Sequence, residues 1–185
     1  MKLKLITSNP GKVEEFRSAF SEYGVEISHL RTPYDEIQTS ELEEVVRKGI
    51  DSLRSEGLKN FIIDDSGLFI DGLGGFPGVY SSYVQKTVGN PGILRLMQDL
   101  NERRAEFRCC IGCDVCGETM IVTGVCKGFI LRKEKGEGGF GFDPIFSTDC
   151  LRSFAEISTE EKNKLSHRGL ATELLIGEMK KRNLL

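Results

Sequence analysis

The sequence predicts a mixed α/β domain of 185 residues that is built around one twisted sheet. In its first part, short apolar runs alternate with amphipathic helical patterns, which is typical of strands connected through helices. The middle of the chain instead has the pattern of two long neighbouring strands that are joined by a tight turn. We find no internal repeat and no linker, and we therefore expect a single domain over residues 1–185.

The first part predicts the order strand, helix, strand, helix. An apolar run at 3–6 predicts a buried strand, and a second strand is expected at 25–30. Between them, apolar residues recur every three or four positions and predict a helix that ends at Gly24. They are Val13, Phe16, Phe20 and Tyr23. The second helix is expected from Glu41 to about Arg54. Its apolar face contains Leu42, Val45, Val46, Ile50 and Leu53.

The middle of the chain predicts a third strand, a helix and a hairpin. The third strand is expected at 61–64 and should end in a turn at Ser66 and Gly67. A helix over 93–100 follows Pro91. The hairpin strands are expected at 107–115 and 119–130, joined by a turn at 116–118.

The last part contains a glycine-rich, charged segment and two helix starts. The segment 132–146 is expected to be a functional or mobile loop. Ser158 with Glu161 predicts a capping box, and a last helix should follow Ser166. The residues expected to be buried on that helix are Leu170, Ala171, Leu174 and Leu175.

Composition and charge exclude several classes of function. With 39% hydrophobic and 29% charged residues, the chain has the composition of a globular protein. A net charge of −3 and the lack of a long basic stretch disfavour a nucleic-acid polymer as partner, but not a small phosphorylated ligand. No apolar run has the length of a membrane span or the form of a signal peptide. We therefore expect a cytoplasmic protein.

The six cysteines raise the question of a zinc site, because four of them lie in 109–116. Cys110 and Cys113 have a spacing that zinc ligands use, but a second such pair is missing. On a strand these two side chains would also point to opposite faces. We expect small buried thiols in a reducing compartment rather than a metal centre.

A phosphate site is one interpretation of TSNPGKVEEF at 7–16. Asn9 is a good helix N-cap and Pro10 suits the first helical position. The free amide groups of such a helix start attract anions, and Lys12 would lie in the first turn. Taken alone, these residues favour an ordinary capped helix, because Glu14 and Glu15 also suit the positive end of a helix dipole.

A metal site is one interpretation of IIDDSGL at 62–68. Asp64 and Asp65 follow an apolar strand, where open α/β sheets bind ligands, and carboxylates hold Mg²⁺ together with substrate phosphates. Consecutive strand residues point to opposite faces, so only one of the two aspartates faces a given ligand. The apolar residues before them do not indicate which one, and a polar strand end with a local turn fits as well.

Two further motifs have the chemistry of base binding. In GGFGFDPIF at 138–146, two phenylalanines flank Gly141 before Asp143, and they could stack on a flat ligand or point into the core. In EEKNKLSHRG at 160–169, Lys162, His167 and Arg168 could donate hydrogen bonds to a base or a phosphate, or form a solvated helix start. All four motifs together make up a nucleoside triphosphate site. The chain has neither a Walker A motif nor a GxGxxG helix start, which disfavours a P-loop ATPase and a dinucleotide oxidoreductase.

These motifs, in this order and spacing, resemble the inosine triphosphate pyrophosphatase family, whose members are Ham1-like. The motifs are TSNPGKVEE, DDSGLFIDGLGGFPGVYS, FGFDPIF and FAEISTEEKNKLSHR, and the resemblance runs from about residue 3 to the C-terminus. It implies Mg²⁺-dependent hydrolysis of the non-standard purine nucleotides ITP, dITP and XTP to the monophosphate and pyrophosphate. It also implies an elongated α/β fold with an active-site cleft between two lobes, and a homodimer.

The resemblance also implies roles for individual residues. Asp65 is the expected general base and, with Glu36, a metal ligand, while Glu44 and Asp64 are secondary metal candidates. Ser66 is expected to contact the substrate. The triphosphate is expected at Thr7, Ser8, Asn9, Pro10, Gly11 and Lys12. The base is expected at Phe140, Gly141, Phe142, Asp143, Lys162, His167 and Arg168.

The sequence departs from the family pattern at two of these positions. Ser8 stands where glycine is usual, and Phe142 precedes the loop aspartate where some members have tryptophan or tyrosine. One alternative is a house-cleaning nucleotide pyrophosphatase of the septum-formation-inhibitor (Maf) type, with a different base preference. A nucleotide-binding regulatory protein without turnover is the other alternative.

Overall fold

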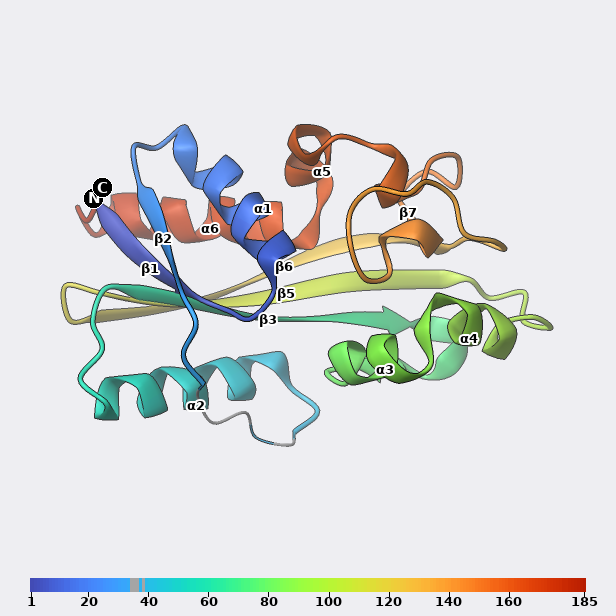
Figure 1. The fold of residues 1–185 in the computed structure, drawn as a ribbon, viewed down its shortest axis with the longest axis horizontal. Coiled ribbons are helices and arrows are strands. Elements are labelled where there is room, and N and C mark those ends of the chain that lie inside the picture. The colour runs from blue at the N-terminus through green and yellow to red at the C-terminus, as the bar shows by residue number, and fades with distance from the viewer. Residues whose placement is uncertain (34–36, 38) are drawn as a thin grey trace.

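A computed structural model describes residues 1–33, 37 and 39–185, and it has one mixed sheet at its centre. The strands lie in the order β2-β1-β3-β5-β6-β7, with β4 paired to β3. They are β1 (Lys2–Ile6), β2 (Glu26–Leu30), β3 (Phe61–Ile70), β4 (Pro77–Gly78), β5 (Arg104–Val115), β6 (Glu118–Ile130) and β7 (Phe146–Ser147). The pairs β1–β2 and β1–β3 are parallel and the others are antiparallel. The long strands β3, β5 and β6 run along the long axis of the molecule (Figure 1).

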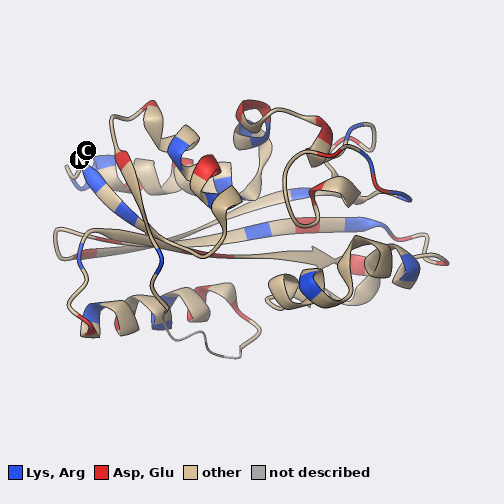
Figure 2. Ribbon diagram, viewed as in Figure 1, with Lys and Arg blue, Asp and Glu red and all other residues tan. Residues whose placement is uncertain are grey.

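Helices cover both faces of this sheet. They are α1 (Pro10–Ser21), α2 (Leu42–Ser55), α3 (Ser81–Thr87), α4 (Gly89–Leu96), α5 (Thr159–Leu165) and α6 (His167–Lys181). Helices α1, α5 and α6 lie on one side, and α2, α3 and α4 lie on the other (Figure 1). Positively and negatively charged residues are interspersed over α1, α2 and α6 (Figure 2). The elongated mixed α/β fold expected from the sequence is confirmed.

The helix starts follow the predicted local chemistry. Asn9 caps α1, because its Oδ1 accepts a hydrogen bond from the Gly11 N–H at 2.9 Å, and Pro10 is the first helical residue. Ser166 caps α6 by accepting from the Gly169 N–H at 3.1 Å. Ser158 caps α5, as expected, but Glu161 forms an ion pair with Arg152 at 2.5 Å instead of completing a capping box.

The predicted buried face of α6 was wrong in part. Ala171 and Leu175 are fully buried as expected, whereas Leu174 is 51% exposed and Leu170 is half-buried. The helix buries the polar residues His167, Arg168 and Thr172 on the same side as its apolar residues. A prediction from apolar residues alone does not count these polar positions as buried. It therefore places Leu174 on the buried face, where the structure instead has Thr172 and Arg168.

The predicted turn after Asp65 was also wrong. Strand β3 continues without interruption to Ile70, and it pairs with β5 from Phe61↔Asp114 to Ile70↔Ala105. This long pairing outweighs the local turn preference of Ser66 and Gly67. Strand β1 pairs with β3 only at Lys4↔Phe61 and Leu5↔Ile62, and it ends at Ile6. The two aspartates therefore lie just beyond the carboxyl end of β1, at the edge where ligands bind in such sheets.

Smaller differences concern the middle of the chain. Helix α3 was not predicted, and α4 begins at Gly89 and ends at Leu96 instead of covering 93–100. The hairpin β5–β6 is confirmed, and its turn residues Cys116 and Gly117 both have positive φ. The loop 132–146 is mostly irregular, as expected, but it contains a short 3₁₀ turn at 143–145 and the start of β7.

The cysteines form no metal centre among the residues that the structure describes. Cys110 and Cys113 belong to separate core clusters, which confirms that they point to opposite faces of the sheet. Burial raises the pKa of Cys113 to about 12 and that of Cys110 to about 11, so these thiols stay protonated.

Candidate functional site

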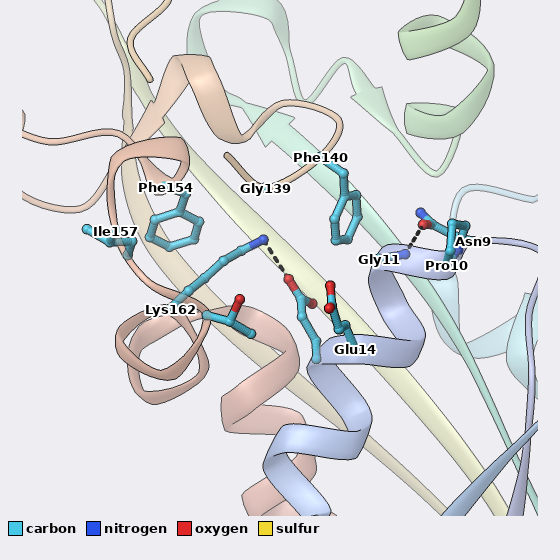
Figure 3. A pocket seen from close by; sticks show the side chains of 11 residues that line it. Asn9, Pro10, Gly11, Glu14, Gly139, Phe140, Phe154, Ile157 and Lys162 are labelled. Atoms are coloured by element: carbon cyan, nitrogen blue, oxygen red, sulfur yellow. Dashed lines mark hydrogen bonds and ion pairs between the residues drawn. The ribbon is translucent and has the colours of Figure 1, made fainter. Parts of the chain in front are cut away.

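A pocket of about 300 Å³ lies between the start of α1, the loop before β7 and α5. Asn9 lines it from the cap of α1 and Gly11 from the first turn, Phe140 from the loop, and Phe154 and Lys162 from the C-terminal part. Figure 3 shows the Lys162 side chain extending between the rings of Phe140 and Phe154. The pocket therefore joins the predicted phosphate motif to the predicted base loop, although the two are far apart in sequence.

The phosphate motif forms a fixed turn before α1. Thr7 Oγ1 accepts a hydrogen bond from the Asn9 N–H at 3.1 Å, and Ser8 and Pro10 are exposed beside it. Lys12 extends to the strand β3, where its Nζ lies 3.0 Å from Asp64 Oδ2 and 3.1 Å from the Asp64 carbonyl oxygen. The positive end of the helix and this ammonium group lie together, as an anion site requires.

A chain of alternating charges connects Lys12 to the base loop. Asp64 Oδ2 lies 3.1 Å from Arg168 Nε, and Arg168 also pairs with Glu15. Lys162 Nζ lies 2.6 Å from both a Glu15 and an Asp143 oxygen. The sequence of charges is Lys12, Asp64, Arg168, Glu15, Lys162 and Asp143. Apart from Lys12, these side chains are buried, so their positive and negative charges have to balance within the network.

The pKa values show how this balance is held. Burial would raise the pKa of Glu15, but Arg168 and Lys162 together hold it below its ordinary value. The pKa of Asp64 is likewise lowered, because Lys12 and Arg168 outweigh the effect of burial. Burial dominates at Asp143, where the pKa lies above its ordinary value in spite of Lys162. Arg168 has a raised pKa because Glu15 and Asp64 exceed the opposing effect of burial.

The base loop places one of its two phenylalanines in the pocket. The ring centroid of Phe140 lies 4.6 Å from Lys162 Nζ, and a Cβ at Gly11 would lie only 2.4 Å from this ring. Phe142 instead belongs to the core and is 4% exposed. Gly141 has a φ of 63°, and its carbonyl accepts hydrogen bonds from Gln85 and Asn90, each at 3.1 Å. These bonds fix the loop between the two phenylalanines.

His167 lies at the start of α6 behind this loop. Its ring stacks on Phe107 with centroids 4.6 Å apart, and its Nδ1 is buried without a hydrogen-bond partner among the described residues. Burial, with the positive charges of Arg168 and Lys162, lowers the pKa of His167 well below 6.5. The ring is therefore neutral at neutral pH.

A neutral buried histidine makes stability depend on pH in a definite direction. In the unfolded chain His167 takes up a proton below about pH 6.5, and in the folded chain its lowered pKa prevents this. The free energy of unfolding should therefore fall by up to ~1.4 kcal/mol for each pH unit below that value. We expect His167→Gln to show a flatter dependence between about pH 6.5 and 5 in urea unfolding curves. Equal slopes in the two proteins would contradict a buried neutral ring.

Asp65 lies on the opposite face of the sheet from Asp64. It pairs in register with Cys110, which packs with Val46 and Ile50 of α2. Asp65 is half-buried, and its Oδ1 accepts a hydrogen bond from the Ser66 N–H at 2.9 Å. Ser66 points the other way and contacts both Asp64 Oδ2, at 3.1 Å, and Arg168 Nη2, at 2.8 Å. The side chains of Asp64 and Asp65 thus lie on different sides of β3.

The carboxylates near Asp65 fit a hard cation by their chemistry. Glu43, like Asp65, is close enough for its charge to raise the pKa of Cys110, although burial is the main cause. Glu44 is exposed and its Oε2 accepts from Thr39 Oγ1 at 2.5 Å. Glu36, the other expected metal ligand, lies outside the described residues. No group of three metal-binding side chains occurs in the described part of the chain, but Mg²⁺ uses only one or two carboxylates when substrate phosphates supply the rest.

Sequence reasoning missed Glu15, which is the centre of the charge network. It was interpreted as a partner of the helix dipole, together with Glu14. Neither glutamate lies in the first turn of α1. Glu14 is exposed, whereas Glu15 is 4% exposed and pairs with Arg168 and Lys162. Its position had no local signal, because Glu15 lies outside the three- and four-residue spacing of Val13, Phe16 and Phe20. Gln85 and Asn90 donate hydrogen bonds to the loop at Gly141, and no sequence motif indicates this role.

Comparison with known proteins places this chain in a family. Residues 3–178 match the model of the Ham1 family. The chain is 51% identical over 172 residues to a protein named dITP/XTP pyrophosphatase from Thermococcus kodakarensis, covering 92% of this chain and 93% of that one. The corresponding protein of Pyrococcus horikoshii is 49% identical, with 92% of each chain covered.

Solved structures agree with this assignment. The Ham1 protein of Staphylococcus aureus superposes with a TM-score of 0.82 at 27% identity, over 98% of this chain and 100% of that one. A HAM1 protein from Coxiella burnetii gives a TM-score of 0.81 at 30% identity, over 98% and 99%. The similarity thus extends over nearly the whole length of both chains in sequence and in structure. The chain belongs to the Ham1 family.

Proposed function

We propose that this protein hydrolyses non-standard purine nucleoside triphosphates, namely dITP, ITP and XTP, to the monophosphate and pyrophosphate. The observation that carries the proposal is the buried charge network, which connects the phosphate-side Lys12 with the base-side Lys162, Arg168 and Asp143. The names of the relatives from Thermococcus kodakarensis and Pyrococcus horikoshii support the same substrates. The family match favours this proposal over the alternative of a septum-formation-inhibitor type enzyme.

Base selectivity follows from the hydrogen-bond chemistry of the pocket. Hypoxanthine and xanthine have an oxygen at position 6, which accepts hydrogen bonds, whereas adenine has an amino group that donates them. Lys162 and Arg168 can only donate, so an amino group placed against them would leave buried donors unpaired. Such a mismatch rejects a wrong ligand strongly. Phe140 offers a ring face for stacking beside these donors.

The proposed reaction is displacement of pyrophosphate by water at the α-phosphorus. Asp65 orients the water and accepts its proton, while the Ser66 N–H holds the carboxylate in position. Lys12 and the start of α1 bind the phosphates beyond the carboxyl end of β1, at the edge of the sheet that both aspartates border. We propose Mg²⁺ as the cofactor, held by Asp65 with Glu36, and with Glu44 and Asp64 as secondary candidates. When bound, it would neutralise charge on the phosphate oxygens.

The test is a substrate panel with detection of released pyrophosphate in the presence of Mg²⁺. We expect rapid release from dITP, ITP and XTP, and much slower release from dATP. A preference for a pyrimidine or a methylated nucleotide would instead favour the septum-formation-inhibitor type. Binding of dITP without any release of pyrophosphate would identify a nucleotide-binding protein and overturn the enzymatic proposal.

The role of Lys12 can be tested separately from turnover. We expect Lys12→Ala to weaken binding of dITP by roughly 10- to 100-fold, because a charge-assisted contact to phosphate is lost. Binding of the nucleoside deoxyinosine should change little. Calorimetry with EDTA present measures both, and Lys4→Ala, an exposed lysine on β1, is the matched control. Equal losses for nucleotide and nucleoside would contradict a phosphate-binding role.

We also propose that the protein is a cytoplasmic homodimer. Exposed aromatic residues gather in the segment that precedes and includes α3, where Phe76, Tyr80 and Tyr83 are 39%, 50% and 68% exposed. Such a surface is typical of an interface. No helix in the described residues has the length and apolar character needed to cross a membrane. Light scattering coupled to size-exclusion chromatography gives the molecular mass, and a monomer at all concentrations would contradict the dimer.

A further inference from the structure

A second hollow, of about 420 Å³, lies where the end of α4 meets the end of β6. Leu94, Arg95 and Gln98 line it from α4 and the turn after it. Arg103 lines it from the residue before β5, and Arg132 from the residues after β6. Its volume lies in the range of small-molecule sites. Three of its five lining residues are arginines, and none is aromatic.

Arg103 is fixed in place by backbone groups. Its Nε donates to the Ile130 carbonyl at 2.6 Å, its Nη2 to the Leu131 carbonyl at 2.7 Å, and its Nη1 to the Met97 carbonyl at 3.0 Å. A guanidinium group has more N–H donors than these three bonds use. Arg103 is therefore half-buried and held in one orientation, with donors remaining for a ligand.

The positive charges around this hollow are not balanced by carboxylates. Other arginines are paired: the neighbouring Arg104, for example, lies 2.8 Å from Glu102 and 3.5 Å from Asp71. For Arg95, Arg103 and Arg132, the described part of the chain supplies no carboxylate within 4.0 Å. Burial lowers the pKa of Arg103, and the positive charge of Arg132 lowers it further. The guanidinium of Arg103 nevertheless remains protonated. An anion between these groups would remove their mutual repulsion.

We propose that this hollow binds a compact phosphate anion, such as inorganic pyrophosphate, at a site separate from the pocket beside α1. Guanidinium groups form paired hydrogen bonds with phosphate oxygens, and several of them together match a multiply charged anion. The lack of an aromatic ring among the lining residues disfavours a nucleotide, because nothing there stacks on a base. The inference rests on these side chains and does not depend on the proposed hydrolysis.

The test uses ¹⁵N-labelled protein titrated with pyrophosphate, with EDTA present to exclude divalent cations. We expect saturable shifts of the amide resonances at 95–98 and 131–133, in addition to any shifts at 9–12. The double variant Arg95→Gln with Arg132→Gln should weaken the former shifts by about tenfold or more and leave those at 9–12 unchanged. Arg103 is left intact because its bonds to the backbone also hold β6 and α4 together.

The control variant also removes two positive charges, but far from the hollow in the sequence. Lys181→Gln with Arg182→Gln removes two exposed positive charges at the end of α6, and it should leave both sets of shifts as they are. The proposal is overturned if millimolar pyrophosphate gives no saturable shift at 95–98 and 131–133. It is also overturned if the two double variants behave alike. Pyrophosphate release from dITP, measured on the same samples, tests the proposed hydrolysis independently of this result.

Discussion

Replacing Asp65 with asparagine is expected to lower kcat for dITP hydrolysis by roughly 10²- to 10⁴-fold. The amide cannot accept the proton of the attacking water and is a poor ligand for Mg²⁺. The fold should be unaffected, because the side chain is half-buried and the Ser66 N–H can still bond to the amide oxygen. Initial rates of pyrophosphate release at saturating dITP, with circular dichroism to verify the fold, measure this effect.

The neighbouring Asp64 provides a matched control on the same strand. It is buried, and it pairs with both Lys12 and Arg168. Asp64→Asn should therefore destabilise the protein, by about 3–5 kcal/mol if the buried pairs are lost. The two variants should differ in kind, since one loses turnover and the other loses stability. A near-normal kcat in Asp65→Asn would rule out Asp65 as the general base and make Asp64 the next candidate.

Local chemistry made part of this site predictable. The cap at Asn9, the first-turn proline and the position of Lys12 follow from preferences within a few residues, and all three occur as expected. The loop predicted to bind the base borders the pocket through Phe140, whereas Phe142 lies in the core. Which of two adjacent aromatic residues faces a ligand depends on packing against distant elements, and a short motif does not contain that information.

Contacts between distant parts of the chain explain what was missed. The turn predicted at Ser66 and Gly67 is absent because β5, some forty residues later, pairs with β3 along its whole length. The side of the sheet that each aspartate faces is set by the same register. Glu15 was assigned to a helix dipole because its partners, Lys162 and Arg168, lie at the other end of the sequence. Buried polar groups follow no apolar pattern, so their positions become evident only once the elements are assembled.

Glu15→Gln is expected to cause a large loss of stability. The variant keeps the size of the side chain but removes the negative charge between Arg168 and Lys162, each of which keeps only one carboxylate partner. Breaking a buried ion pair by removing one partner costs about 3–5 kcal/mol. We therefore expect a fall of this order in the free energy of unfolding at neutral pH, measured by urea denaturation. Selectivity for dITP over dATP should also decrease, because the two base-side donors lose their shared anchor.

The adjacent Glu14→Gln is the control, since it makes the same chemical change at an exposed position of the same helix. Its effect on stability should stay within about 0.5 kcal/mol. The pH dependence distinguishes a lost charge from a general packing defect. Because the pKa of Glu15 is lowered in the folded state, its contribution is present above the ordinary value of 4.5 and is lost as the pH falls through the folded pKa. The difference in the free energy of unfolding between wild type and Glu15→Gln should therefore become smaller in acid. If this difference is constant with pH, the charge of Glu15 does not stabilise the network.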